Sequence, residues 1–330
     1  MKPFLAKVTR GERLSEQEAG LAMATIMDGE ATPAQIGALL AALALRGETE
    51  DEIVGFARTM RARAVPVAAP GAIDTCGTGG DGAGTFNIST VASLVVAACG
   101  VPVAKHGNRS ASGGSADLLE ALGVRIDAPV EVVQRCLDDV GWTFLFAPSF
   151  HASTRHAVGP RKDLGIRTAF NLLGPLTNPA TPLAQVVGVP RPELTEFLAR
   201  CLQRLGVARA WVVHGSGLDE ISLCGPTRVT AFDDGALRTF TIQPQDAGLD
   251  PCPAEALHGG EVPANVRIAR AVLDGTRGPT RDVVLLNAAA ALIVAGRAAD
   301  LRDGVAQAGR AVDEGRAGAL LGRVVEATRA

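Results

Sequence analysis

Aromatic residues are scarce in this chain, which has 10 Phe, 2 Trp and no Tyr among its 330 residues. Broad aromatic stacking surfaces are therefore not expected. Excess charge is lacking as well, because the net charge is −3 and the sequence pI is about 6.0. Such a balance gives no general attraction to nucleic acid or to an anionic membrane, so any bound anion must be held by a local site.

Paired cysteines and long apolar runs are also missing. The six cysteines form no CxxC pair and no secretory signal precedes them, so we expect reduced thiols in a cytoplasmic protein rather than disulfides or a cysteine metal site. The most apolar helical run, DVVLLNAAAALIVAG from Asp282, spans only about 14 apolar residues, whereas roughly 20 are needed to cross a bilayer. It predicts a buried helix.

Residues 1–68 contain the start and stop signals of several short helices. Three S/T-x-x-E/Q patterns, typical of a capped helix start, begin at Ser15, Thr32 and Thr49. Gly47 is placed to end the second of these helices. The sequence predicts three or four helices here, with no strand between them.

From residue 69 to 330, strand-like and helix-like segments alternate. Strand candidates are residues 72–75, 101–105, 143–147, 185–189 and 210–214, and residues 227–232 and 237–242 are typical of a hairpin. This alternation predicts an α/β domain with a mainly parallel central sheet, larger than the helical domain before it. Residues 150–182 interrupt the pattern, and we interpret them as an excursion that completes the helical domain and brings charged residues to a cleft.

The stretch DTCGTGGDGAGTFNIST, residues 74–90, places five glycines between a strand candidate and an apolar helical segment. Such a turn leaves backbone N–H groups free to surround an anion, and the helix N-terminus adds partial positive charge. The stretch lacks the Gly-Lys-Ser/Thr of a Walker A motif and the glycine spacing of a dinucleotide fingerprint. A flexible turn is the alternative, but its interleaved hydroxyl groups exceed what a turn requires.

A second stretch, KHGNRSASGGSAD at residues 105–117, also follows a strand candidate and opens a helix. Alone, a lysine or arginine there would be ordinary surface charge, and a histidine a core residue. Lys105, His106, Asn108 and Arg109 together with three serines form a denser set of donors than solvation needs. Two anion-binding loops of this kind indicate a ligand with more than one phosphate.

Two further groups of charged residues suit the same ligand. Asp219 and Glu220 in HGSGLDEISL offer oxygen ligands for Mg²⁺, although an isolated acidic pair is usually a solvated turn. In the excursion, we expect Arg161 to bind a substrate carboxylate. We expect structural salt bridges for the other basic residues of the excursion, Arg155, Lys162 and Arg167.

These features together predict a Mg²⁺-assisted enzyme that handles a pyrophosphorylated sugar or nucleotide. No arrangement of residues indicates a covalent nucleophile, and residue chemistry alone leaves the acceptor open. The stretches GTGGDGAGTFNIST, KHGNRS, GIRTAFNLLGPLTNPA and HGSGLDEI, taken in this order, resemble the motifs of anthranilate phosphoribosyltransferases. The resemblance runs from about Leu14 to the C-terminus.

The resemblance implies a fold like that of nucleoside phosphorylases and phosphoribosyltransferases, a homodimer joined through the helical domain, and a role in tryptophan biosynthesis. It implies transfer of phosphoribose from phosphoribosyl pyrophosphate to the amine of anthranilate. The donor would be bound by Gly77, Gly80, Asp81, Thr85, Asn87, Ile88, Ser89, Thr90, Lys105, His106, Gly107, Asn108, Arg109, Ser112 and Ser115. Mg²⁺ would be held by Ser89, Asp219 and Glu220. Anthranilate would meet Gly77, Asn108 and Arg161, with His106, His151 and Pro175 along its path, and no residue is assigned as a general base.

Two departures from the family pattern keep alternatives open. The loop KHGNRSASGGSAD is two residues shorter than the usual KHGNRxxSSxxGSAD, and Gly113 replaces its second serine. The usual His-Pro-Ala-Met is HisAlaSerThr at residues 151–154, so a relative that uses another aromatic amine or a base is a second hypothesis. A catalytically silent relative that binds nucleic acid is a third, but the sequence pI near 6.0 argues against it.

Overall fold

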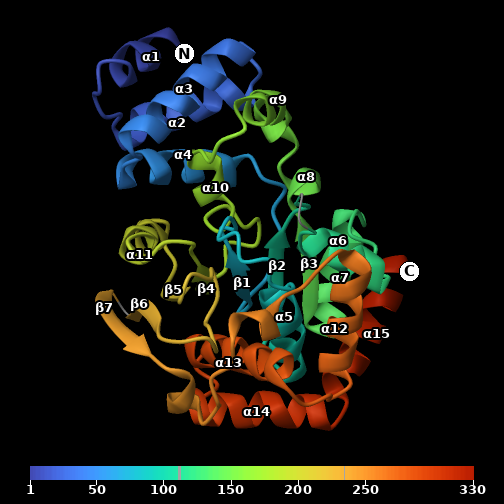
Figure 1. Ribbon diagram of the computed structural model, residues 1–330. Helices are drawn as coiled ribbons and strands as arrows, with labels where there is room; N and C mark the ends of the chain where they lie inside the picture. The colour runs from blue at the N-terminus through green and yellow to red at the C-terminus, as the bar shows by residue number, and fades with distance from the viewer. Residues whose placement is uncertain (111–112, 234) are drawn as a thin grey trace.

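The computed structural model describes residues 1–110, 113–233 and 235–330. A small helical N-terminal domain lies on one end of a larger α/β domain (Figure 1). The N-terminal helices are α1 (Lys2–Val8), α2 (Glu16–Met27), α3 (Pro33–Arg46) and α4 (Glu50–Ala62). All three expected capping boxes are present. The hydroxyls of Ser15, Thr32 and Thr49 each accept a hydrogen bond from the backbone N–H of the residue three positions later in the chain. The prediction of short helices without a strand between them is confirmed.

The α/β domain is built on one seven-stranded sheet with the order β3-β2-β1-β4-β5-β6-β7. The strands are β1 (Ile73–Gly77), β2 (Val103–Gly107), β3 (Trp142–Phe146), β4 (Ala184–Gly188), β5 (Arg209–Gly215), β6 (Thr227–Asp233) and β7 (Ala236–Ile242). The first five are parallel to one another, and β6 and β7 form an antiparallel hairpin on β5. Both the mainly parallel sheet and the attached hairpin were expected from the sequence.

Helices cover both faces of the sheet. They are α5 (Ile88–Ala98), α6 (Ser115–Leu122), α7 (Val130–Val140), α11 (Leu194–Arg204), α12 (Val262–Leu273), α13 (Pro279–Val294), α14 (Leu301–Asp313) and α15 (Arg316–Arg329), with short 3₁₀ turns η2 (Pro244–Ala247) and η3 (Ala254–Leu257). The expected apolar helix is α13, which is buried along nearly its whole length against α5 and α14. Within the described residues, no helix is both long and apolar enough to span a bilayer.

The segment between β3 and β4 returns to the helical domain. It forms α8 (Ala147–Phe150), η1 (Ala152–Thr154), α9 (Arg155–Leu164) and α10 (Ala169–Leu173). Helix α9 packs against α2 and α3, and α10 packs against α3 and α4, as the green ribbons beside the blue ones show (Figure 1). One apolar core runs from these helices through α11 to β4 and β5, which ties the two domains together.

The order of the sheet also marks where a ligand is expected. From β1 the chain moves outward to β2 and β3, and then returns to the other side of β1 with β4 and β5. In open parallel sheets, ligands bind beyond the carboxyl ends of the strands where this direction reverses. The glycine-rich stretch follows β1 directly, at the carboxyl end where β1 and β4 lie side by side.

Candidate active site

The glycine-rich loop lies between the end of β1 and the start of α5. Its first residues are fixed by Thr78, whose N–H donates to the carbonyl of Gly188 at the end of β4 (2.9 Å). A side chain at Gly77 would bring a Cβ within 2.3 Å of Asp219 Oδ2, so this position requires glycine. The loop is thereby pressed against the acidic pair that the sequence singled out.

Three carboxylates gather under this loop. Asp219 accepts the N–H of Gly79 (2.7 Å), Asp81 accepts the N–H of Asp219 (3.3 Å), and Glu220 accepts the N–H of Ser89 (3.0 Å). Burial, helped by the charge of Asp81, raises the pKa of Asp219 to about 7. Burial and the neighbouring Asp219 raise the pKa of Glu220 to about 8. Crowded carboxylates of this kind favour a bound cation, because it offsets their mutual repulsion.

The donor set fits Mg²⁺, which prefers oxygen ligands and commonly completes its shell with substrate phosphates and water. No three His, Cys, Asp or Glu side chains in the described part of the chain are grouped as a closed metal site. A Mg²⁺ ion beside Ser89, Asp219 and Glu220 would therefore need oxygen atoms from a bound substrate.

Lys105 lies beneath this acidic group and its side chain is only 2% exposed. Its ammonium group donates to the carbonyl of Thr75 and, at 3.5 Å, to Ser89 Oγ. Next to it, the fully buried Asp74 accepts hydrogen bonds from the His106 N–H (3.3 Å) and the Asn178 side chain (2.8 Å). Burial raises the pKa of both Asp74 and Glu220, and the positive charge of Lys105 offsets part of that rise.

The start of α5 contributes mainly backbone to the site. Ile88 and Thr90 are buried, so these two residues offer the loop their main-chain groups. Asn87 does not cap the helix and instead donates to the carbonyl of Gly113 (3.0 Å), which joins the two glycine-rich loops. Thr85 pairs with His258 in an isolated bridge.

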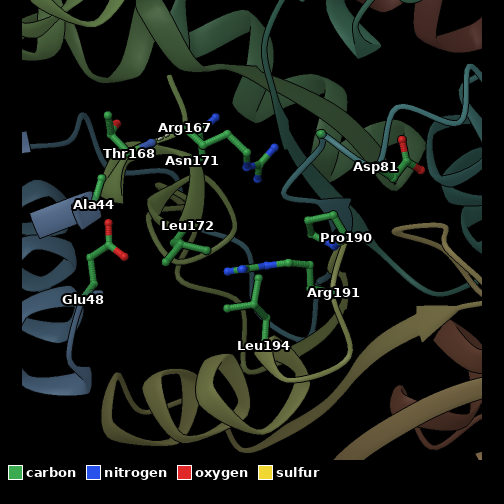
Figure 2. Close-up of a pocket in the computed structure, with 11 residues that line it drawn as sticks. Ala44, Glu48, Asp81, Arg167, Thr168, Asn171, Leu172, Pro190, Arg191 and Leu194 are labelled. Atoms are coloured by element: carbon green, nitrogen blue, oxygen red, sulfur yellow. Dashed lines mark hydrogen bonds between the residues drawn. The ribbon is translucent and has the colours of Figure 1, made fainter. Parts of the chain in front are cut away.

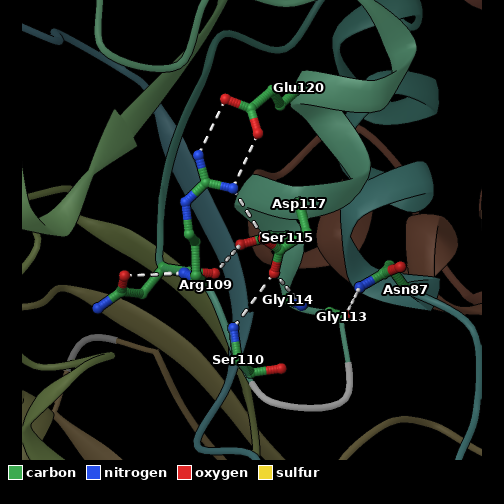
Figure 3. A network of polar contacts seen from close by, with 9 residues as sticks. Asn87, Arg109, Ser110, Gly113, Gly114, Ser115, Asp117 and Glu120 are labelled. Carbon is green, nitrogen blue, oxygen red and sulfur yellow. Dashed lines mark hydrogen bonds and ion pairs between the residues drawn. The ribbon is translucent and has the colours of Figure 1, made fainter. Parts of the chain in front are cut away.

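In the second loop, Arg109 pairs with two acidic residues of α6 (Figure 3). Its guanidinium donates to Asp117 (2.8 Å) and to both oxygens of Glu120 (2.8 and 2.9 Å). Ser115 packs on the backbone at Gly107, where an added Cβ would lie 2.2 Å from its hydroxyl oxygen. The predicted donor residue Ser112 lies outside the described residues.

Three cavities meet at Gly80, which lines each of them. The glycine cavity, about 670 Å³, is bounded by Gly80, Asp81, Gly82, Gly84, Thr85, Gly113, Gly260, Glu261 and Val262. The histidine cavity, about 470 Å³, lies between β1, β2 and α10, and its walls include Gly77, His106, Asn108, His151, Arg161, Phe170 and Pro175. The arginine cavity, about 340 Å³, contains Arg167 and Arg191 (Figure 2).

The histidine cavity holds two neutral imidazoles. His106 Nδ1 faces the carbonyl of Gly174 (3.1 Å) and His151 Nε2 faces that of Thr177 (2.8 Å), so each of these nitrogens carries the proton. Burial lowers the pKa of both rings, that of His106 to about 3. The rings meet edge to face with centroids 5.4 Å apart.

Arg161 supplies the charge of this cavity. Its guanidinium lies 4.9 Å above the ring of Phe170, and it has no hydrogen bond or ion pair to another described residue. A cation free to form new bonds beside an aromatic ring and two neutral imidazoles suits an aromatic carboxylate.

The expected salt bridges of the excursion are not present. Within the described residues, Arg155, Lys162 and Arg167 have no carboxylate oxygen within 4.0 Å. Arg167 instead donates to the carbonyl of Gly79 (2.7 Å), inside the glycine-rich loop. The interpretation of Arg167 as a structural salt bridge is therefore wrong.

Comparisons with known proteins agree with this geometry. The helical bundle domain of a glycosyl transferase family matches residues 2–64, and the a/b domain of the same family matches residues 69–318. Anthranilate phosphoribosyltransferase of Moorella thermoacetica is 58% identical over 330 residues, covering 98% of this chain and 97% of that protein. The chain belongs to the anthranilate phosphoribosyltransferase family.

Solved structures of this family have the same fold. The crystal structure of anthranilate phosphoribosyltransferase from Thermus thermophilus is 47% identical, with a TM-score of 0.94 and 99% of each chain covered. The Saccharomyces cerevisiae anthranilate phosphoribosyltransferase in complex with PRPP and Mg is 26% identical, with a TM-score of 0.90, covering 99% of this chain and 97% of that one.

One wall of the site in this anthranilate phosphoribosyltransferase family member was missed from the sequence. Gly259 donates its N–H to the carbonyl of Gly84 (2.8 Å), and an added Cβ there would lie 2.8 Å from the backbone of Phe86. The buried Asn265 holds the same turn by bonding both polar groups of Gly260. The only signal in the sequence was the glycine pair in HGGE, which is weak in a chain with 38 glycines.

Proposed function

We propose that this chain transfers the phosphoribosyl group of phosphoribosyl pyrophosphate to the amine of anthranilate, with release of pyrophosphate, in tryptophan biosynthesis. The observation that carries this proposal is the junction of two chemically different cavities at Gly80. On one side are the backbone of the glycine-rich loop and the carboxylate of Asp81, and on the other a free guanidinium beside an aromatic ring. Its relatives are named for the same reaction.

The donor is assigned to the glycine cavity and the loop residues around it. Its phosphates would bind to the N–H groups of the loop and of the first turn of α5, where the helix dipole favours negative charge. Lys105 and Arg109 stabilise the surroundings of this site, because their side chains hydrogen-bond to Ser89 and Glu120, respectively. The remaining donor residues keep the assignment given by the family resemblance.

The metal is assigned to Ser89, Asp219 and Glu220, whose oxygens lie at the junction between the loop and α5. Mg²⁺ bound there would offset the negative charge that develops on the leaving pyrophosphate. These residues also hold the loop itself, because the two carboxylates accept the N–H groups of Gly79 and Ser89. Metal and donor would thus be positioned by the same hydrogen bonds.

The acceptor is assigned to the histidine cavity. Arg161 would bind the carboxylate of anthranilate, Phe170 would contact its ring, and Asn108 and Gly77 lie on the side towards the donor. An arylamine is a nucleophile near neutral pH, so its orientation relative to the ribose matters more than its deprotonation. His106 and His151 remain uncharged at neutral pH, so neither ring forms an ion pair with the substrate carboxylate.

We propose three wider features with this function. The chain divides at residues 68 and 69, and residues 150–182 complete the helical domain; the packing of α9 and α10 against the N-terminal helices supports this. It works in the cytoplasm as a homodimer joined through the helical domain. Its partners are small molecules rather than nucleic acid, in keeping with the net charge of −3.

The test follows anthranilate fluorescence in a mixture of purified protein, anthranilate, phosphoribosyl pyrophosphate and Mg²⁺, with each component omitted in turn. A decay that requires all three small molecules is the expected result. Donor binding without decay would point to another aromatic acceptor. The absence of both donor binding and decay would refute the proposed function.

A further inference from the structure

We propose that Arg167 binds the diphosphate of the donor and the pyrophosphate that is released. This inference rests on the proposed function and adds a binding residue that the sequence had assigned to a structural role. It starts from the position of the guanidinium, which lies where the arginine and histidine cavities meet the glycine-rich loop.

Arg167 is carried by the segment between α9 and α10. Gly165 ends α9 in the left-handed conformation, and the chain then turns so that the Arg167 side chain reaches the loop of Asp81 (Figure 2). Its Nη1 donates to the carbonyl of Gly79, and an added Cβ at Gly80 would lie 1.4 Å from the same nitrogen. Only a glycine at position 80 allows the guanidinium to lie on the backbone of the phosphate loop.

Most of the hydrogen-bonding capacity of Arg167 is unused. A guanidinium has five N–H donors, and the bond to Gly79 is the one that Arg167 makes with the described residues. Arg109, the arginine that the motif suggested, is in the opposite situation, because Asp117 and Glu120 occupy it (Figure 3). Arg109 thus uses three of its five donors on carboxylates, whereas Arg167 uses one and leaves the other four for phosphate oxygens.

The charges around Arg167 fit such a role. Burial lowers the pKa of Arg167, the nearby carboxylates of Asp219 and Asp81 offset part of this, and the neighbouring Arg191 adds to it; the arginine remains protonated throughout. The carboxylates lie beyond 4.0 Å, so no ion pair fixes the guanidinium on them. A bound diphosphate would supply the close anionic partner that the protein does not.

The test measures binding of inorganic pyrophosphate with Mg²⁺ by isothermal titration calorimetry, in wild type, Arg167→Ala and Arg167→Lys. We expect about a 10- to 100-fold loss of pyrophosphate affinity for Arg167→Ala, because this is the usual contribution of a charge-assisted hydrogen bond to binding. Arg167→Lys should lie between, because an ammonium lacks the planar fork. Lys162→Ala is the matched control, since Lys162 is an exposed cation in the last turn of α9 and its side chain has no partner among the described residues.

Anthranilate binding, followed by its fluorescence, separates the possible outcomes. Unchanged anthranilate affinity with weakened pyrophosphate binding in Arg167→Ala supports the proposal. Wild-type pyrophosphate affinity in Arg167→Ala, or a selective loss of anthranilate affinity, overturns it while the proposed function stands. If the wild-type chain binds neither ligand, the proposed function fails and the role of Arg167 fails with it.

Discussion

Replacing Asn178 with alanine should weaken the fold more than its small size suggests. The side chain is fully buried and makes three hydrogen bonds of 2.8 Å, to Asp74, to the carbonyl of Ala104 and from the N–H of Ala180. Each buried group left without its partner costs about 1–3 kcal/mol. We therefore expect a loss of about 3–5 kcal/mol in the free energy of unfolding, a large share of the usual 5–15 kcal/mol.

The measurement is urea unfolding followed by circular dichroism, with Ser93→Ala as the matched control. Ser93 is also fully buried, but its hydroxyl makes two hydrogen bonds, from the indole of Trp142 (3.0 Å) and to the carbonyl of Thr90 (2.6 Å), and neither partner is a carboxylate, so about 1–2 kcal/mol should be lost. Asn178 directly follows Thr177, which lines the histidine cavity, so KM for anthranilate should rise as well. A stability loss for Asn178→Ala no larger than that of the control would refute the reasoning.

Three further predictions concern the site. Arg161→Ala should raise KM for anthranilate about 10- to 100-fold through a lost charge-assisted bond; an equal rise in the donor KM would remove Arg161 from the acceptor site. Asp219→Asn with Glu220→Gln should abolish Mg²⁺-dependent turnover, and should raise stability in metal-free buffer above pH 8, because burial disfavours both charged forms; unchanged turnover would contradict the metal assignment. His106 has a pKa of about 3 when folded and about 6.5 when unfolded, so between pH 7 and pH 5 it takes up a proton only in the unfolded chain. The free energy of unfolding should therefore fall by about 2 kcal/mol on account of this residue as the pH drops from 7 to 5. In His106→Gln the urea midpoint should depend less on pH over that range, and an unaltered pH dependence would show that the ring titrates freely.

Much of the architecture could be predicted because it depends on local patterns. The capping boxes at Ser15, Thr32 and Thr49 mark helix starts through bonds made within four residues, so no tertiary information is needed. The strands and the hairpin follow from apolar runs and turn residues of the same short range. Proximity to the glycine-rich loop could also be expected for Asp219 and Glu220, since both follow the end of a parallel strand.

The roles of individual charged residues were decided by tertiary structure. Arg109 and Arg167 each stand in a recognisable motif, yet their partners lie 8 to 88 residues away, and sequence spacing carries no information on which cation meets which acid. Asp74 and Asn178, 104 positions apart, meet because β1 and the returning segment share one buried layer. The sequence by itself thus determined the elements, the family motifs and the chemistry on offer, because these depend on neighbours along the chain. Which guanidinium is free, which lysine is buried and where the cavities meet depend on packing between distant segments, and only the folded chain decides them.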